Sequence, residues 1–181
     1  MRTHRLYSSL LPAVGVSVVL LAGTCGIANA QQTTSATYSD WVFQCVNNGT
    51  PPKKTCDIAQ VTQVRGKNIT FSRVAIESAV KGKPEKLIIQ LPVNVSLHDP
   101  VEVQIPGTPP STLAAPFDHC VPAGCFASAQ IKDDVLKKFN ATEGMGKVTF
   151  KDAAERDIAV PMSFKGFHQA FDALSKASTG K

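Results

Sequence analysis

The fold is organised around one short stretch, Cys120-Val121-Pro122-Ala123-Gly124-Cys125. Two cysteines, a proline and a glycine within six residues are typical of a tight turn that a disulfide closes. The segment from Leu113 to Cys120 and the segment from Cys125 to Gln130 both have the composition of β-strands. We therefore interpret the stretch as a covalently closed turn that joins two strands.

A second cysteine pair lies nearer the N-terminus. Trp41, Phe43 and Cys45 share one face of an expected strand that begins near Tyr38, and apolar residues also cover its other face. Turn-forming residues fill 47–54, and an apolar strand pattern resumes at Cys56. An antiparallel return can place Cys45 opposite Cys56, at the spacing that a disulfide needs. Four cysteines nevertheless allow three pairings, and the residues alone leave them open.

The rest of the chain predicts further short strands and two helices. Apolar residues alternate over 71–76, 87–91 and 101–105, and again in a hairpin over 148–162. Helical spacing predicts an amphipathic helix over 131–139 and a terminal helix over a sheet, with an apolar stripe of Phe164, Phe167, Ala170, Phe171 and Leu174. This pattern predicts a mainly β fold, a sandwich or an open barrel of about eight strands.

The first thirty residues have the features of a secretory signal peptide. Arg2 and Arg5 precede an apolar run over 10–22, and Ala28-Asn29-Ala30 matches a small-residue cleavage site. We expect cleavage after Ala30. The alternative is a lipoprotein signal that ends at Cys25, although Thr24 is unfavourable immediately before a lipidated cysteine.

This cleavage divides the chain into a signal peptide (1–30), a flexible mature N-terminus (31–37), one domain (38–175) and a flexible tail (176–181). The mature part keeps Cys45, Cys56, Cys120 and Cys125, an even number that favours disulfides in an exported protein. It contains no segment apolar enough to cross a bilayer. The formal charge of +5 falls to +3 without Arg2 and Arg5. Its basic residues are scattered, which argues against nucleic-acid binding.

Cys120, Cys125 and His119 are the candidates for redox or metal chemistry. Four residues separate the cysteines, which is not the two-residue spacing of thioredoxin-like centres and matches no common zinc signature. Asp118, His119 and Cys120 are consecutive, and neighbours in a strand face opposite sides, so they do not form a catalytic relay. We therefore expect a structural disulfide and no catalytic, metal or cofactor residues. A periplasmic redox or metal-handling factor that uses Cys120, Cys125 and His119 is the alternative.

Several segments, in this order, resemble the invasion-associated locus B family of exported proteins from Gram-negative bacteria. The segments are Asp40-Trp41-Val42-Phe43-Gln44-Cys45, Cys56-Asp57-Ile58-Ala59-Gln60, Leu91-Pro92-Val93-Asn94-Val95-Ser96-Leu97, Cys120 to Cys125, and Phe164-Lys165-Gly166-Phe167 with Ala170 and Leu174. They span nearly the whole mature chain. Asn94 departs from the glycine expected there, and asparagine also tolerates a left-handed backbone.

The resemblance implies an immunoglobulin-like β-sandwich and a periplasmic or outer-membrane-associated location. The family takes its name from members implicated in bacterial entry into host cells, and it supplies no catalytic residues. We therefore expect a non-enzymatic, secreted cell-envelope module that binds another protein or a cell surface, in virulence or in envelope maintenance. No cofactor is expected.

Overall fold

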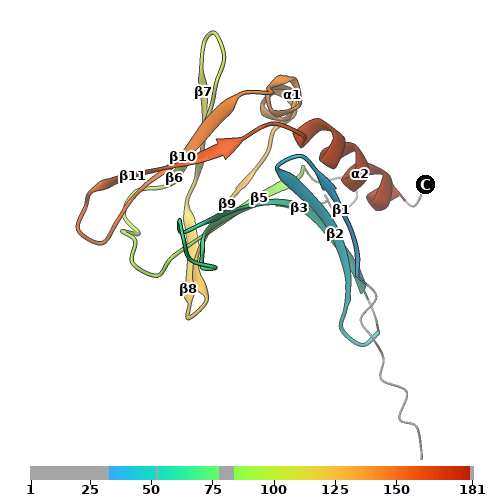
Figure 1. Cartoon of the computed structure of the whole chain (residues 1–181), viewed down its shortest axis with the longest axis horizontal. Coiled ribbons are helices and arrows are strands. Elements are labelled where there is room, and N and C mark those ends of the chain that lie inside the picture. Colours follow the sequence, from blue (N-terminus) through green and yellow to red (C-terminus); the bar gives the residue numbers. More distant parts are fainter. Residues whose placement is uncertain (1–32, 52, 78–83, 180–181) are drawn as a thin grey trace, which may run out of the picture. The chain divides into compact units, whose positions relative to one another are not determined.

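The computed structural model describes residues 33–51, 53–77 and 84–179, which belong to one unit, Gln31–Lys181. The expected signal peptide, its cleavage after Ala30 and the alternative lipid site at Cys25 lie outside the described residues. The described residues form eleven strands and two helices, which Figure 1 labels. None of these helices is long and apolar enough to cross a membrane.

The strands form two antiparallel sheets. The larger sheet has the order β1-β2-β3-β4-β5-β9-β8, with β1 (Thr34–Tyr38), β2 (Trp41–Asn48), β3 (Lys53–Gln63), β4 (Thr70–Glu77), β5 (Lys86–Leu91), β9 (Gly124–Gln130) and β8 (Phe117–Val121). The smaller sheet has the order β11-β10-β6-β7, with β11 (Asp157–Ser163), β10 (Met145–Lys151), β6 (Val101–Ile105) and β7 (Ser111–Ala115). The helices are α1 (Asp133–Ala141) and α2 (Phe167–Thr179).

Alternating residues of both sheets build one hydrophobic core. In β5, Leu87, Ile89 and Leu91 are buried, and every second residue of β6 is buried as well. These side chains belong to a single apolar cluster that also includes residues of α1 and α2. The expected mainly β sandwich is therefore confirmed.

Helix α2 covers β1, β2 and β3 (Figure 1). Its predicted stripe is buried at Phe167, Ala170 and Leu174, because these residues face the sheet. Phe167 makes an edge contact with Trp41, with ring centroids 5.1 Å apart, and the Trp41 indole donates a hydrogen bond to the Ser163 carbonyl (2.9 Å). We call β1 to β3 with α2 the helix-covered region.

The N-terminal strands differ from the sequence expectation. Residues 34–38 form β1 and pair with β2, whereas we expected residues up to 37 to be flexible. Hydrogen bonds between backbone groups hold an edge strand even when its side chains are small and polar. A turn at Ser39 and Asp40 then separates Tyr38 from β2. Val42, expected to be covered, is exposed.

Two further elements differ from expectation. The predicted strand over 113–120 divides into β7 and β8, which belong to different sheets, because Pro116 between them lacks an amide hydrogen for a ladder bond. Phe164 is buried but precedes α2 rather than lying within it. The helix also continues to Thr179, beyond the expected boundary at 175, since Ala177 still packs against the core.

Candidate functional site

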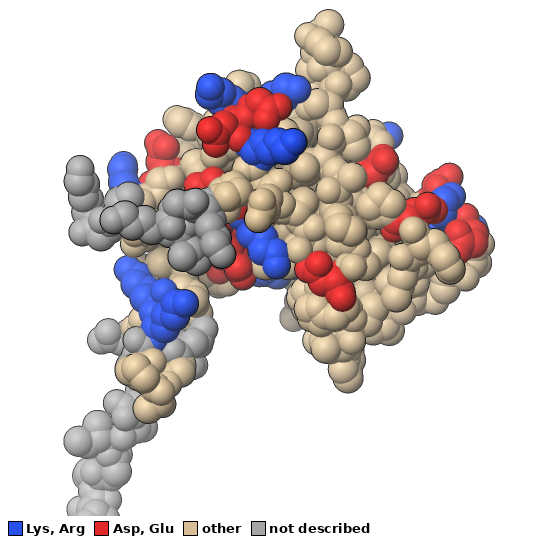
Figure 2. All heavy atoms as spheres, turned by 180° about the vertical axis from the view of Figure 1, so that it is seen from behind, with Lys and Arg blue, Asp and Glu red and all other residues tan. Residues whose placement is uncertain are grey.

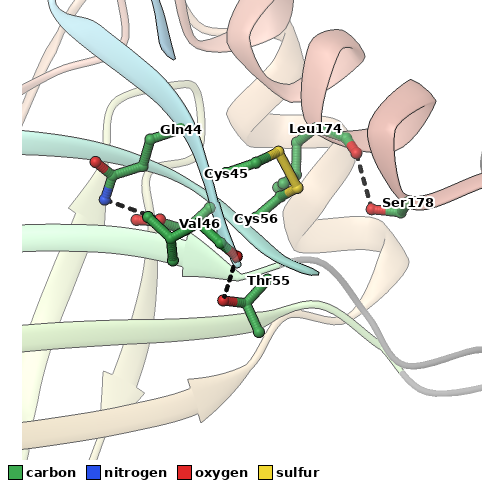
Figure 3. The surroundings of a disulfide bond; sticks show 8 residues. Gln44, Cys45, Val46, Thr55, Cys56, Leu174 and Ser178 are labelled. Atoms are coloured by element: carbon green, nitrogen blue, oxygen red, sulfur yellow. Dashed lines mark hydrogen bonds between the residues drawn. A yellow bond between two sulfur atoms is a disulfide. The ribbon is translucent and has the colours of Figure 1, made fainter. Parts of the chain in front are cut away.

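The first predicted disulfide, between Cys45 and Cys56, lies in the helix-covered region. The two cysteines are directly opposite in the register of β2 and β3, with their sulfur atoms 2.06 Å apart. Both residues are buried, at 3% and 7% exposure. Figure 3 shows the bridge beneath α2, close to Leu174 and Ser178. This bridge is part of the protein core.

The second predicted disulfide joins Cys120 to Cys125 and closes the β8–β9 turn. Cys120 is exposed, whereas Cys125 is only 2% exposed. The Gln90 side-chain amide donates a hydrogen bond to the Ala123 carbonyl (2.8 Å), which fastens the turn to β5. Gly124 has a φ of +145°, and a Cβ at this position would lie 2.5 Å from the Leu91 carbonyl oxygen. The turn therefore requires glycine for its close approach to β5.

The side chains next to this bridge contact strand β9. His119 stacks on Phe126 with ring centroids 5.1 Å apart, and the Asp118 carboxylate accepts a hydrogen bond from the Ser128 hydroxyl (2.6 Å). Each residue thus interacts with β9 rather than with the other or with a Cys120 thiolate. Over the described ranges, no group of three or more His, Cys, Asp or Glu residues is placed to hold a metal ion.

A polar pocket of about 240 Å³ lies where α2 begins. Its lining includes Glu143, Lys165 and His168, and His168 lies 3.7 Å from Asp172, one turn along α2. The pocket contains none of the candidate redox or metal residues Cys120, Cys125 and His119, although Phe164, Lys165 and Gly166 of the resemblance segment line it. Nothing in its lining is both buried and without a partner, so its geometry favours no particular ligand.

Four loops meet at one end of the sandwich, and we call this end the loop end. It comprises the loops 64–69, 92–100 and 152–156 and the β8–β9 turn with the strand residues on either side of it, 121–124, at the lower left of Figure 1. The antiparallel register places the loops of the larger sheet at the same end. Arg73, near the start of β4, pairs with Gln90, near the end of β5. Leu91, at the end of β5, pairs with Cys125, near the start of β9. The loop end is therefore assembled by both sheets.

Backbone hydrogen bonds fix the 92–100 loop to the β10–β11 turn. The Ser96 amide donates to the Lys151 carbonyl (2.9 Å), and Val95 forms an isolated antiparallel bridge with Asp152. Val95 and Ser96 are buried. The loop is thus held at its centre while residues on either side remain outside the core.

Asp152 orders the β10–β11 turn. Its carboxylate accepts hydrogen bonds from the backbone amides of Ala154 (2.9 Å) and Arg156 (3.0 Å) and from the Arg156 guanidinium (2.7 Å). The hydrogen bond from the Arg156 side chain, followed by the one from its backbone, holds the pKa of the Asp152 carboxyl below its usual range. The same ion pair raises the pKa of Arg156. The turn is therefore held in one conformation by a charged residue.

Large apolar side chains are exposed on the loop end. Of the seven such side chains exposed in the described part of the chain, four lie there: Val93 (61%), Ile69 (55%), Leu97 (54%) and Val121 (41%). Single exposed apolar residues are common on protein surfaces, whereas a group of them marks an interaction site. On the face shown in Figure 2, charged side chains form small groups of both signs rather than one patch. The loop end is thus the candidate binding surface.

The sequence did not identify this surface, although it contained part of the signal. Val93, Val95 and Leu97 lie in the segment that carries the family resemblance, and their spacing is that of a strand. Only the structure shows that Val95 is buried and that Val93 and Leu97 are exposed. Apolar residues within a loop rich in proline, asparagine and aspartate were the available sequence signal.

Comparisons with known proteins agree with the fold. The family model described as "Invasion associated locus B (IalB) protein" matches residues 41–175. The crystal structure of invasion associated protein B from Bartonella henselae is similar, with a TM-score of 0.67 and 19% sequence identity, over 81% of this chain and 99% of that chain. No curated protein sequence matches the chain. At this identity the structural likeness shows the fold.

Proposed function

Because the chain belongs to the invasion-associated locus B family, we propose that it is a non-enzymatic binding module of the Gram-negative cell envelope. In this proposal, residues 1–30 direct export and are removed, and the mature protein works in the periplasm or at the outer membrane. The two disulfides support an oxidising compartment, where such bonds persist. The module contacts a partner protein through the loop end.

The observation that carries the proposal is the group of exposed apolar side chains at the loop end, where hydrogen bonds and a disulfide hold the loops. Removing apolar surface from water contributes about 25 cal/mol per Å² on binding. Ordering flexible loops opposes that gain, and preorganised loops avoid most of this cost. The Cys120–Cys125 bridge, the Gln90 hydrogen bond and the Asp152 contacts preorganise the loop end. The surface is therefore suited to binding without rearrangement.

Cross-linking in the native envelope tests this proposal. The wild-type protein is compared with the double variant Val93→Ser and Leu97→Ser, which changes only exposed side chains of the loop end. We expect the variant to lose at least about tenfold of the captured partner, because burying one such apolar side chain contributes about 1.5–3 kcal/mol and about 1.4 kcal/mol is tenfold in affinity. Captured proteins are identified and quantified by mass spectrometry.

A matched control uses Val42→Ser and Met145→Ser, which replace two large apolar side chains that are also exposed but lie outside the loop end. The control variant is expected to capture the partner as well as wild type does. Equal loss in both double variants, or no loss in the loop-end variant, contradicts the proposed surface. Turnover by the purified protein that a point mutation outside the cysteines abolishes contradicts a non-enzymatic role.

A further inference from the structure

The two disulfides are chemically the same, but the residues that surround them differ. Cys45 and Cys56 lie in strands with neighbours on both sides, since β1 pairs with β2 and β4 pairs with β3. Helix α2 covers them (Figure 3). Cys120 lies in β8, the edge strand of the larger sheet, and is exposed to solvent. Access to the two bridges is therefore unequal.

We infer that the Cys120–Cys125 bridge is a site of thiol–disulfide exchange, at which an external thiolate attacks the sulfur of Cys120. The co-reactant is a small thiol such as glutathione, or the dithiol of a thiol–disulfide oxidoreductase. This modification site is independent of which partner the loop end binds. It does not require the cysteines to act as catalysts.

The direction of attack explains why Cys120 receives the thiolate. A thiolate approaches a disulfide in line with the bond, from the side opposite the departing sulfur. For Cys120 that side lies beyond β8, where the larger sheet ends. For Cys125 that side faces β5, because Cys125 pairs with Leu91. Only Cys120 thus offers an open line of approach.

The same rule protects the other bridge. In-line attack on Cys45 comes from the side of β1, where Thr34 is its paired residue. Attack on Cys56 comes from the opposite side of the bridge, where the pairing of β3 with β4 ends one residue away, at Asp57 and Glu77. Helix α2 lies above both sulfur atoms. Exchange at this bridge therefore requires α2 or a neighbouring strand to move away first, and only a minor fraction of molecules is open at any time.

The exchange proceeds in two balanced steps. In the first, the thiolate RS⁻ forms a bond to Cys120 Sγ, the Cys120–Cys125 bond breaks, and Cys125 leaves as a thiolate that takes a proton. In the second, another thiolate attacks the R sulfur of the mixed disulfide, which releases Cys120 as a thiolate that is then protonated. The bridge gains two electrons and is reduced to two thiols. The two R thiolates lose these two electrons and are oxidised to RSSR. The reverse sequence reforms the bridge.

Disulfide mapping of the native full chain tests the inference without any substitution. The protein is incubated with reduced glutathione, free thiols are trapped with N-ethylmaleimide at intervals, and peptides are identified by mass spectrometry. We expect the Cys120–Cys125 bridge to open at least about tenfold faster than the Cys45–Cys56 bridge, because only the latter waits for structural opening. The glutathione adduct is expected on Cys120.

Equal opening rates for both bridges overturn the inference, and so does an adduct found mainly on Cys125. Near-ultraviolet circular dichroism of Trp41, which packs on Phe167, reports whether the fold persists during the reaction. Loss of that signal before the first bridge opens also counts against the inference, since exchange then requires unfolding.

A matched pair of variants gives a second measurement. Cys125→Ser leaves Cys120 as a free thiol, and Cys120→Ser leaves Cys125. We expect Cys120 to react with Ellman's reagent at least about tenfold faster than Cys125, because exposure controls thiol reactivity. Similar rates in two folded variants contradict the assigned line of approach. If either variant is unfolded, the wild-type mapping decides.

Discussion

The helix-covered region and the loop end each contain one disulfide, but the surroundings of the two bonds differ. In each, a disulfide joins directly opposite residues of an antiparallel hairpin. The Cys45–Cys56 bridge is buried with Trp41 and Phe167 beneath α2, whereas the Cys120–Cys125 bridge closes an exposed turn. The comparison shows that one bridge adds to an existing core, while the other holds a turn in a place that has little core of its own.

The largest expected effect is in the helix-covered region. Trp41→Ala removes the side chain that contacts Phe167 and bonds to the Ser163 carbonyl. We expect the free energy of unfolding to fall by about 3–5 kcal/mol, as for other large buried side chains. Leu97→Ala on the loop end is expected to change it by less than about 0.5 kcal/mol. Urea unfolding measures both free energies, and a similar loss for the two variants contradicts the difference in packing between the two regions.

Removal of each bridge in turn measures how much each disulfide stabilises the fold. Replacing Cys45 and Cys56 by alanine is expected to lower the free energy of unfolding by about 3 kcal/mol, and replacing Cys120 and Cys125 by about 2 kcal/mol, because the first bridge closes the longer loop. Burial adds to the first cost, since the buried sulfur atoms leave a cavity. Denaturant unfolding of the two double variants gives the order, and the reverse order contradicts this account.

The smallest effect concerns the Asp152 carboxylate and depends on pH. Its folded-state pKa is lowered, chiefly by the Arg156 hydrogen bond, so the charged form stabilises the folded protein above the pKa of the unfolded chain, about 4. This contribution is lost as pH falls through the lowered pKa. We expect wild type to be more stable than Asp152→Asn at pH 7 and the difference to shrink by pH 3. A difference that stays constant between these pH values contradicts this assignment.

Much of the sandwich could be predicted because strand periodicity records which residues face the core. The pattern of β5, β6, β10 and β11 gave their positions, and the opposition of Cys45 and Cys56 follows from a simple hairpin. The terminal helix was predictable from the stripe that packs beside Trp41. These elements share one property. The apolar side chains whose spacing identifies each element in the sequence are the same side chains that pack in the core.

The other elements depend on contacts that side-chain patterns do not record. Strand β1 is held by backbone hydrogen bonds to β2. Pro116 lies between β7 and β8, where the chain crosses from the smaller sheet to the larger one. For the candidate site, the sequence indicated the cysteines but not their unequal exposure. It also did not separate the buried Val95 from the exposed Val93 and Leu97, because that difference arises from hydrogen bonds to a distant hairpin.

The placement of α2 also affects the order of events during folding. Cys45 and Cys56 lie in β2 and β3, which the 13 residues of α2 cover once the helix docks. An oxidising enzyme needs contact with the two thiols, and α2 removes that contact once it docks. Oxidation is therefore fastest before α2 docks, and after docking it waits for a local opening that exposes the two thiols. The docking of α2 thus sets how readily the Cys45–Cys56 bond forms.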